Sequence, residues 1–124
     1  MPRSRQCLIV DDSRVVRSIS RQIVESLGYS VIEAENGQEA LARCRSEMPD
    51  LILLDWDMPV MTGLEFITHL RAVDTLHRAK AVFCTSKNET SDIVKGIAAG
   101  ADEYVTKPFT EASLRAKLER IGAI

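Results

Sequence analysis

Residues 51–55 read LILLD, an apolar run that ends in an aspartate, and residues 7–12 read CLIVDD, a second run of the same kind. Neither run alternates apolar and polar residues, which is typical of strands covered on both faces of a parallel sheet. Open α/β sheets bind ligands beyond the carboxyl ends of their strands. If the two strands are neighbours, Asp11, Asp12 and Asp55 share one crevice, where we expect the chemistry of this chain.

Strand and helix patterns alternate along the rest of the sequence. Val16, Ile19, Ile23 and Leu27 recur at helical spacing before Gly28, which predicts a helix over about 13–27. Further strands are predicted over 30–34, 81–84 and 103–106, and further helices over about 36–46, 62–73, 93–98 and 114–121.

Two helix starts carry a local signal. Asn36 precedes Glu39 by three residues, and Thr62 precedes Glu65 in the same way, which is typical of side chains that satisfy free backbone donors. Five strands that alternate with five helices predict an α/β fold: a doubly wound parallel sheet with right-handed crossovers and helices on both faces.

Composition limits the class of protein. With 124 residues, 45% of them hydrophobic and 27% charged, the chain fits one globular domain over 1–124, and we expect no output domain. A formal net charge of -2 gives no broad basic surface for binding a phosphate backbone, so nucleic acid is not expected as a direct partner. Neither a signal peptide nor a membrane span fits the N-terminal residues, so a cytoplasmic protein is expected. Cys7, Cys44 and Cys84 lack metal-ligand spacing and are interpreted as reduced packing residues, with a redox role as the alternative.

The three aspartates repel one another when they are brought together. At about 4 Å and an effective dielectric constant near 20, each like pair costs roughly 4 kcal/mol. Magnesium would relieve this repulsion, since it takes oxygen ligands and commonly uses one or two carboxylates plus a phosphate. The alternative is that Asp11, Asp12 and Asp55 only cap loops or helix starts.

Two more strand ends carry polar side chains. Thr85 closes the fourth predicted strand and offers a hydroxyl, and Lys107 closes the fifth and offers an ammonium group that could contact a phosphoryl group. This combination predicts phosphoryl chemistry, in which Asp55 attacks phosphorus while Lys107 and Thr85 hold the equatorial oxygens. Taken singly, Thr85 is also a common strand residue and Lys107 a solvated strand end.

At this point the chain resembles the receiver domain of bacterial two-component response regulators, especially the single-domain chemotaxis type. The resemblance covers nearly the whole chain. Its motifs are LIVDDS at 8–13, LLDWDMPVMTG at 53–63, Thr85-Ser86 and YVTKPF at 104–109.

The resemblance implies a mechanism and a set of partners. Asp55 would accept a phosphoryl group from the phosphohistidine of a sensor histidine kinase or a phosphotransfer protein. Asp12, Asp55 and the backbone carbonyl of Asp57 would coordinate Mg²⁺, with Asp11 helping to position it. A monomer that signals to a downstream protein target is expected.

The family also implies a switch and a strand order. Thr85 and Tyr104 match its switch pair, and Lys107-Pro108 matches its usual cis peptide. The strand order 2-1-3-4-5 of flavodoxin-like proteins is carried over from the resemblance. A phosphoryl group at Asp55 would draw the Thr85 hydroxyl inward and change the surface of the fourth helix, fifth strand and last helix. The basic residues there are either a docking face or ordinary soluble exterior: Lys95, Arg115, Lys117 and Arg120.

Other positions leave alternatives open. Asp57 and Lys87 are candidates for an ion pair that lies over the site and alters the phosphate lifetime. His69 and His77 are interpreted as surface or loop residues, and Trp56 as a packing residue that could report metal binding. Asp55-Trp56-Asp57 also resembles the nucleophile motif of haloacid-dehalogenase-type phosphatases, although the order of the acidic segments is reversed. A scaffold that binds a partner without phosphorylation is the third possibility.

Overall fold

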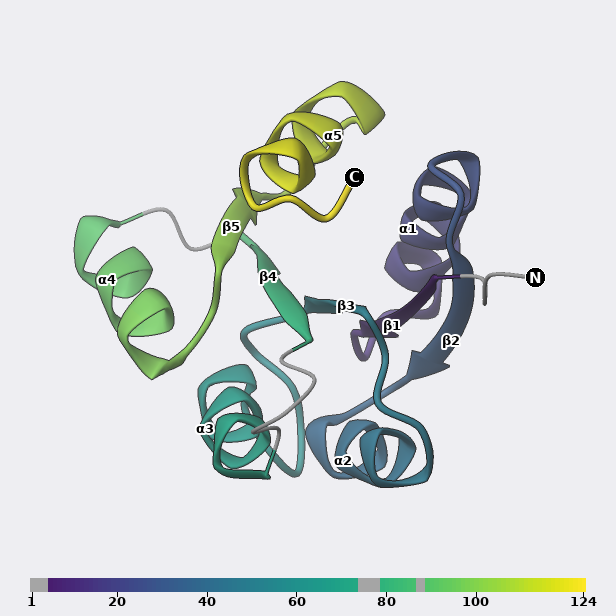
Figure 1. The fold of residues 1–124 in the computed structure, drawn as a ribbon. Helices are drawn as coiled ribbons and strands as arrows, with labels where there is room; N and C mark the ends of the chain where they lie inside the picture. The colour runs from purple at the N-terminus through teal and green to yellow at the C-terminus, as the bar shows by residue number, and fades with distance from the viewer. Residues whose placement is uncertain (1–4, 74–78, 87–88) are drawn as a thin grey trace.

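The computed structural model describes residues 5–73, 79–86 and 89–124. Strands and helices alternate through this part of the chain (Figure 1). The strands are β1 (Gln6–Val10), β2 (Ser30–Ala34), β3 (Leu51–Leu54), β4 (Lys80–Thr85) and β5 (Glu103–Thr106). The helices are α1 (Arg14–Ser26), α2 (Gly37–Ser46), α3 (Gly63–Val73), α4 (Thr90–Ala99) and α5 (Glu111–Arg120). No helix in the described part of the chain is both long and apolar enough to cross a membrane.

The strands form one parallel sheet in the order β2-β1-β3-β4-β5. Helices α1 and α5 lie on one face of the sheet, and α2, α3 and α4 lie on the other (Figure 1). The predicted fold class and strand order are therefore confirmed. In this order β1 lies between β2 and β3, and Val10 at its end is opposite Ala34 on one side and Leu54 on the other.

Successive residues of the central strands enter two separate cores. Leu8 and Val10 of β1 pack under α2 and α3, whereas Cys7 and Ile9 pack under α1 and α5. All four residues of β3 are at most 2% exposed. Full burial of one such side chain contributes about 1.5–3 kcal/mol, so the two strands that carry the aspartates are firmly anchored on both faces.

Side-chain caps begin the helices where the sequence predicted them. The Glu39 amide donates to Asn36 Oδ1 at 2.8 Å. At α3 the caps are reciprocal: the Glu65 amide donates to Thr62 Oγ1 at 3.2 Å, and the Thr62 amide donates to Glu65 Oε1 at 3.1 Å. The helices thus start at defined residues immediately after the loops that leave the carboxyl edge of the sheet.

The apolar residues whose spacing predicts α1 are only partly buried. Ser20 and Val24 are its buried residues, whereas Ile19 is 51% exposed and Val15 is 69% exposed. In α4, Gly96 is the buried residue among those described, and Val94 and Ile97 are exposed. Both helices therefore present apolar side chains to solvent.

The three cysteines are buried and free of disulfides, as expected of reduced packing residues. Burial raises the pKa of the Cys84 thiol to about 12. Cys7 is also fully buried, and its thiol pKa is raised for the same reason. Cys7 and Cys84 therefore remain neutral thiols at physiological pH and fill the core.

Candidate functional site

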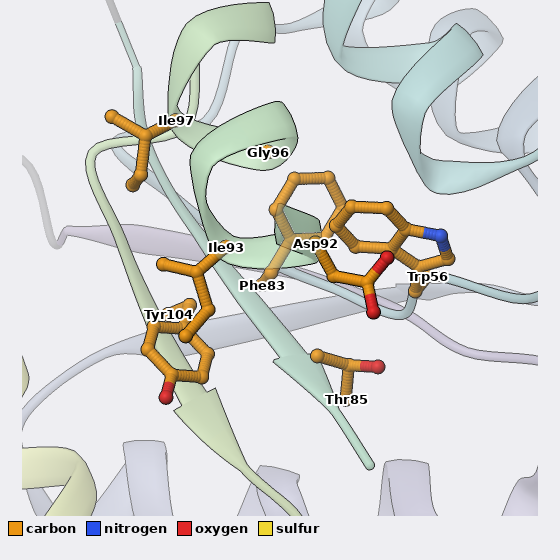
Figure 2. Close-up of a pocket in the computed structure, with 8 residues that line it drawn as sticks. All are labelled: Trp56, Phe83, Thr85, Asp92, Ile93, Gly96, Ile97 and Tyr104. Carbon is orange, nitrogen blue, oxygen red and sulfur yellow. The ribbon is translucent and has the colours of Figure 1, made fainter. Parts of the chain in front are cut away.

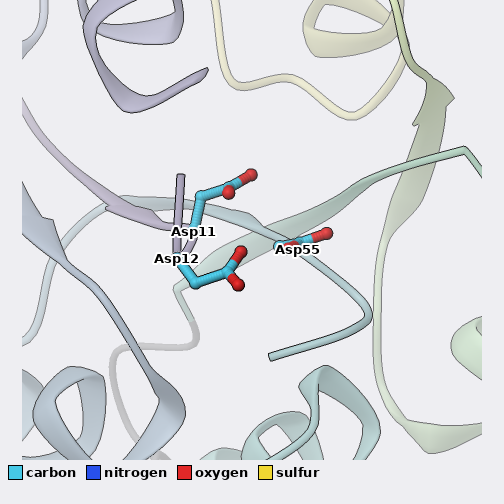
Figure 3. Close-up of side chains that lie close together, drawn as sticks. All are labelled: Asp11, Asp12 and Asp55. Carbon is cyan, nitrogen blue, oxygen red and sulfur yellow. The ribbon is translucent and has the colours of Figure 1, made fainter. Parts of the chain in front are cut away.

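The acidic residues meet where β1 and β3 end. The Asp55 amide donates to the Val10 carbonyl at 2.9 Å, and the Asp11 amide donates to the Ala34 carbonyl at 3.1 Å. These bonds continue the pairing of the strands by one residue. Asp11, Asp12 and Asp55 each offer a carboxylate oxygen within 4.8 Å of the others (Figure 3). The predicted convergence of these side chains is confirmed.

The three carboxylates differ in their access to solvent. Asp11 is 3% exposed and Asp55 is 8% exposed, whereas Asp12 is exposed. Asp11 also turns the chain into α1, because its Oδ1 accepts the Ser13 amide at 2.9 Å. The site formed by these carboxylates, which we call the acidic pocket, is therefore buried at Asp11 and Asp55 and open to solvent at Asp12.

Lys107 supplies the positive charge of the pocket. Its Nζ lies 2.7 Å from Asp11 Oδ2 and 3.2 Å from Asp55 Oδ1. The Lys107 amide donates to the Thr85 carbonyl at 2.8 Å, which ties the end of β5 to the end of β4. The Lys107-Pro108 peptide is cis, as the family resemblance implies.

Burial makes the Asp55 carboxyl unusually basic. Burial raises its pKa, the charge of Asp11 raises it further, and Lys107 opposes both, so that the pKa rises from 3.8 to about 6. For Lys107, burial lowers the pKa, but Asp11 and Asp55 outweigh this effect and the pKa is raised. At neutral pH the lysine is thus a cation and Asp55 is mostly an anion of raised basicity.

The donor set fits a magnesium ion. Three carboxylates against one ammonium leave the cluster with a formal charge of -2, and carboxylate oxygens are the ligands that Mg²⁺ takes. The exposed side of the cluster at Asp12 suits an ion that keeps several of its waters. Asp57 lies in the loop after β3 with an exposed side chain and is not one of the three clustered carboxylates. Coordination through its backbone carbonyl stays a prediction.

Close packing supports the loop that follows Asp55. Trp56 is 8% exposed, and its ring centroid lies 4.8 Å from that of Phe83. The Gly63 amide donates to the Trp56 carbonyl at 2.9 Å. A Cβ atom at Gly63 would overlap the Asp55 carbonyl oxygen and lie 2.8 Å from the Phe83 ring, so glycine is required there.

Thr85 and Tyr104 border one small cavity under α4. Thr85 is 4% exposed, and the cavity between the two side chains has a volume of about 10 Å³. Figure 2 shows the two side chains on different sides of this space, with the Thr85 hydroxyl pointing away from the Tyr104 ring. Such a volume holds about one water molecule, so the Tyr104 ring could enter only if its neighbours moved.

Some predicted residues lie apart from the site. His69 is exposed on α3, as expected of a surface residue. His77 and Lys87 fall outside the described residues, so the ion pair between Asp57 and Lys87 stays a prediction. Arg17 was missed: its Nη1 donates to the Asp11 carbonyl at 2.7 Å. Its place on a helix after the acidic pair gave no signal of this contact.

The strand order and the acidic carboxyl edge are those of a flavodoxin-like α/β protein. The chain belongs to the response regulator receiver domain family, whose sequence model matches residues 7–119. Receiver domains are signalling domains of two-component systems and in general are not enzymes. The resemblance predicted from the motifs is therefore confirmed.

Relatives include both transcriptional regulators and chemotaxis proteins. The phosphate regulon transcriptional regulatory protein PhoB of Escherichia coli is 35% identical over 118 residues, which cover 95% of this chain and 52% of that protein. The chain thus spans about half the length of the PhoB proteins it matches. Chemotaxis protein CheY of Halobacterium salinarum is 37% identical over 111 residues, which cover 90% of this chain and 91% of that protein.

Solved structures show the same fold. Chemotaxis response regulator CheY4 of Vibrio cholerae superimposes with a TM-score of 0.88 at 32% identity, and the match covers 96% of this chain and 99% of that one. A response regulator structure from Chloroflexus aurantiacus gives a TM-score of 0.89 at 27% identity. The likeness to CheY-type proteins extends over nearly their whole length.

Proposed function

We propose that this receiver domain accepts a phosphoryl group on Asp55 from the phosphohistidine of a sensor histidine kinase or phosphotransfer protein, and that phosphorylation changes its affinity for a downstream protein. The observation that carries the proposal is the contact of Lys107 with Asp55 inside the acidic cluster. A buried carboxylate of raised pKa beside a fixed cation is an activated nucleophile with a built partner for phosphoryl oxygens.

The transfer needs one bond to form and one to break. An Asp55 carboxylate oxygen attacks phosphorus, the bond between phosphorus and the donor imidazole nitrogen breaks, and that nitrogen keeps the electron pair. Lys107 is protonated and contacts Asp55, so it can bind an equatorial oxygen of the transferred group. Thr85, at the end of the neighbouring strand, would donate its hydroxyl to another. Bound by Asp12, Asp55 and the Asp57 carbonyl, with Asp11 positioning it, Mg²⁺ would neutralise the negative charge of the site.

The switch follows from the same contacts. A phosphoryl group adds about 1.5 to 2 negative charges and new acceptor oxygens at Asp55, which favours an inward Thr85 hydroxyl. Because the cavity beside Tyr104 is about 10 Å³, inward rotation of the ring requires the residues that line the cavity to shift, and four of them lie on α4: Asp92, Ile93, Gly96 and Ile97. Gly96 is the buried residue among those described on this helix, so few buried side chains resist the shift. Moving the population from 1:99 to 99:1 takes about 5.5 kcal/mol of differential stabilisation.

The output surface would then be the face of α4, β5 and α5. In the present state Lys117 Nζ lies 5.2 Å from the centroid of the Tyr104 ring and 3.6 Å from Glu103 Oε1. Rotation of Tyr104 removes the ring from under this ammonium group. The change in shape and in the position of a charge would be recognised by the downstream protein.

The phosphodonor would contact α1 beside the acidic pocket. Val16, Ile19, Pro108 and Phe109 line an apolar groove of about 330 Å³, and Lys107, which contacts Asp55, forms part of its wall. A protein that delivers a phosphoryl group to Asp55 must lie against this edge of the sheet. The exposed Ile19 gives it an apolar contact there.

The central test is phosphorylation by a small donor. Acetyl phosphate with Mg²⁺ is expected to add one phosphoryl group per chain, detected by intact-protein mass spectrometry. Asp55→Asn should abolish the adduct, whereas Asp57→Asn, two residues away, should retain it. Many turnovers of a small phosphate ester would indicate the phosphatase alternative, and no adduct at all would favour the unphosphorylated scaffold.

Docking is tested by comparing protein and small-molecule donors. Ile19→Glu is expected to slow transfer from a phosphorylated histidine kinase that serves the wild type, while the rate with acetyl phosphate stays unchanged. Val73→Glu places the same charge at a similarly exposed apolar site on α3, outside the proposed output face, and serves as the control. Equal slowing in both variants, or slowing with acetyl phosphate, would contradict a donor site on α1.

A further inference from the structure

We infer that Arg17 is a positioning residue for the acidic pocket, which it serves by fixing the peptide between Asp11 and Asp12. The inference rests on the proposed role of these aspartates in binding Mg²⁺ for phosphorylation of Asp55. Arg17 lies in the first turns of α1, and its side chain is 14% exposed. The side chain is therefore largely buried where it meets the Asp11 carbonyl.

The guanidinium group of Arg17 makes two different contacts. Its Nη1 donates to the Asp11 carbonyl oxygen at 2.7 Å, and its Nε donates to Glu33 Oε1 on β2 at 2.9 Å. The planar guanidinium has several donors in fixed directions, so one contact orients the other. Glu33 thus aims Arg17 at Asp11, and the pair links β2 to the turn that carries both aspartates.

Arg17 holds the Asp11 carbonyl, whereas the other polar groups of Asp11 have other partners. The Asp11 amide is held by Ala34, its Oδ1 by the Ser13 amide and its Oδ2 by Lys107. Its carbonyl belongs to the peptide that leads to Asp12, so rotation of this peptide would turn the exposed Asp12 carboxylate relative to Asp55. By holding the carbonyl, Arg17 restricts that rotation before any ligand binds.

A second arginine offers a matched control. Arg21 lies one helical turn further along α1 and pairs with the same glutamate, at 2.6 Å between Nη1 and Glu33 Oε2. Its other contacts are with the Val31 carbonyl and with Glu25, not with Asp11. Removing Arg21 therefore weakens the link between α1 and β2 without touching the Asp11 carbonyl. A purely structural role of the arginines predicts similar effects of the two substitutions.

The experiment compares Arg17→Gln, Arg17→Lys and Arg21→Gln in the whole chain. Trp56, the single tryptophan, follows Asp55 directly, and its fluorescence is used to titrate Mg²⁺. Loss of a group that orients metal ligands commonly costs about 10-fold to 100-fold in metal affinity. We expect Arg17→Gln to weaken Mg²⁺ binding by about tenfold, and Arg21→Gln to change it less than about twofold. Arg17→Lys keeps the charge but cannot make both contacts, so it should not restore affinity.

Amide hydrogen exchange of Ser13 in the metal-free protein gives an independent readout. This amide donates to Asp11 Oδ1, and its exchange should be faster in both Arg17 variants than in wild type or Arg21→Gln. Unchanged exchange at Ser13, equal loss of Mg²⁺ affinity in Arg17→Gln and Arg21→Gln, or full rescue by lysine would overturn the inference. If wild type bound no Mg²⁺, the proposed function would be refuted instead. Faster Ser13 exchange confined to the Arg17 variants would then still show that Arg17 holds the peptide between Asp11 and Asp12.

Discussion

Replacing Asp55 with asparagine is expected to stabilise the metal-free protein at neutral and alkaline pH, although it removes the phosphoacceptor. Asparagine has nearly the shape of a protonated aspartate and cannot ionise. The substitution therefore relieves the cost of an anion that is buried next to Asp11, a cost that Lys107 only partly offsets.

The size of the effect follows from the pKa of Asp55. The pKa is about 6 in the folded protein and 3.8 without the fold, chiefly because burial raises it. Between these values the folded state binds more protons than the unfolded chain, so the free energy of unfolding falls as pH rises and levels off above about pH 6. At 1.36 kcal/mol for each unit of pKa, ionised Asp55 costs about 3 kcal/mol at pH 8 and about half of that at pH 5.

The assay is urea unfolding in the presence of a chelator at pH 8 and at pH 5. Asp55→Asn should gain up to about 3 kcal/mol at pH 8, and the gain should shrink by about half at pH 5. Asp102→Asn is the control with the opposite sign, because Asp102 accepts hydrogen bonds from Arg71 at 3.1 Å and from the Ala81 amide at 2.8 Å. Added Mg²⁺ should then stabilise wild type more than Asp55→Asn, since a ligand that binds the folded state raises its stability.

Two results would refute this reasoning. If Asp55→Asn were less stable than wild type at pH 8, the contact with Lys107 would outweigh the burial of the carboxylate. If the gain were the same at both pH values, it would not come from ionisation of Asp55, and repacking around the asparagine would explain it.

Three further outcomes are expected. Val60 has φ 73°, a left-handed conformation that asparagine adopts more readily than valine, and it is 72% exposed. Val60→Asn should therefore raise the free energy of unfolding by about 1 kcal/mol, whereas Val73→Asn on α3 should not. A Val60→Asn variant that is no more stable than wild type would count against strain at this residue. Gly63→Ala should destabilise the protein by about 2 kcal/mol or more in urea unfolding, because a Cβ atom there meets the Asp55 carbonyl; a neutral result would show that the loop adapts. Thr85→Ala should still be phosphorylated by acetyl phosphate but should lose the gain in affinity for the downstream protein, and Thr85→Ser should keep it; intact coupling in Thr85→Ala would exclude the proposed switch.

Signals local to the chain predicted most of the fold. The apolar runs that form β1 and β3 are each followed directly by a charged residue, so Asp11 and Asp55 marked the ends of their strands. The caps at Asn36 and Thr62 depend on contacts over three residues, which the sequence displays directly. Once two such strands are neighbours in a parallel sheet, convergence of the carboxylates follows from the geometry of the sheet.

Contacts that depend on packing could not be predicted in the same way. Arg71 donates to the Gly100 carbonyl at 2.9 Å and to the Ala79 carbonyl at 2.7 Å, across two separate loops. The reach of Arg17 to Asp11 likewise depends on how α1 is rotated against β2. That rotation buries Ser20 and exposes Ile19, which apolar spacing alone does not indicate.

The stability cost and the proposed reactivity of Asp55 have one physical cause. A carboxylate with a pKa of about 6 is a stronger base than an ordinary aspartate, and it is still mostly ionised at neutral pH. Burial produces both properties, and Lys107 limits the cost without removing it. Burial of the apolar side chains of β1 and β3 stabilises the folded state and offsets the free-energy cost of burying the Asp55 carboxylate. Binding of a cation favours the ionised carboxylate, so it should stabilise the domain most when Asp55 is ionised and ready for phosphoryl transfer. The coupling between cation binding and ionisation of Asp55 is measured by comparing how much Mg²⁺ raises the free energy of unfolding of wild type and of Asp55→Asn.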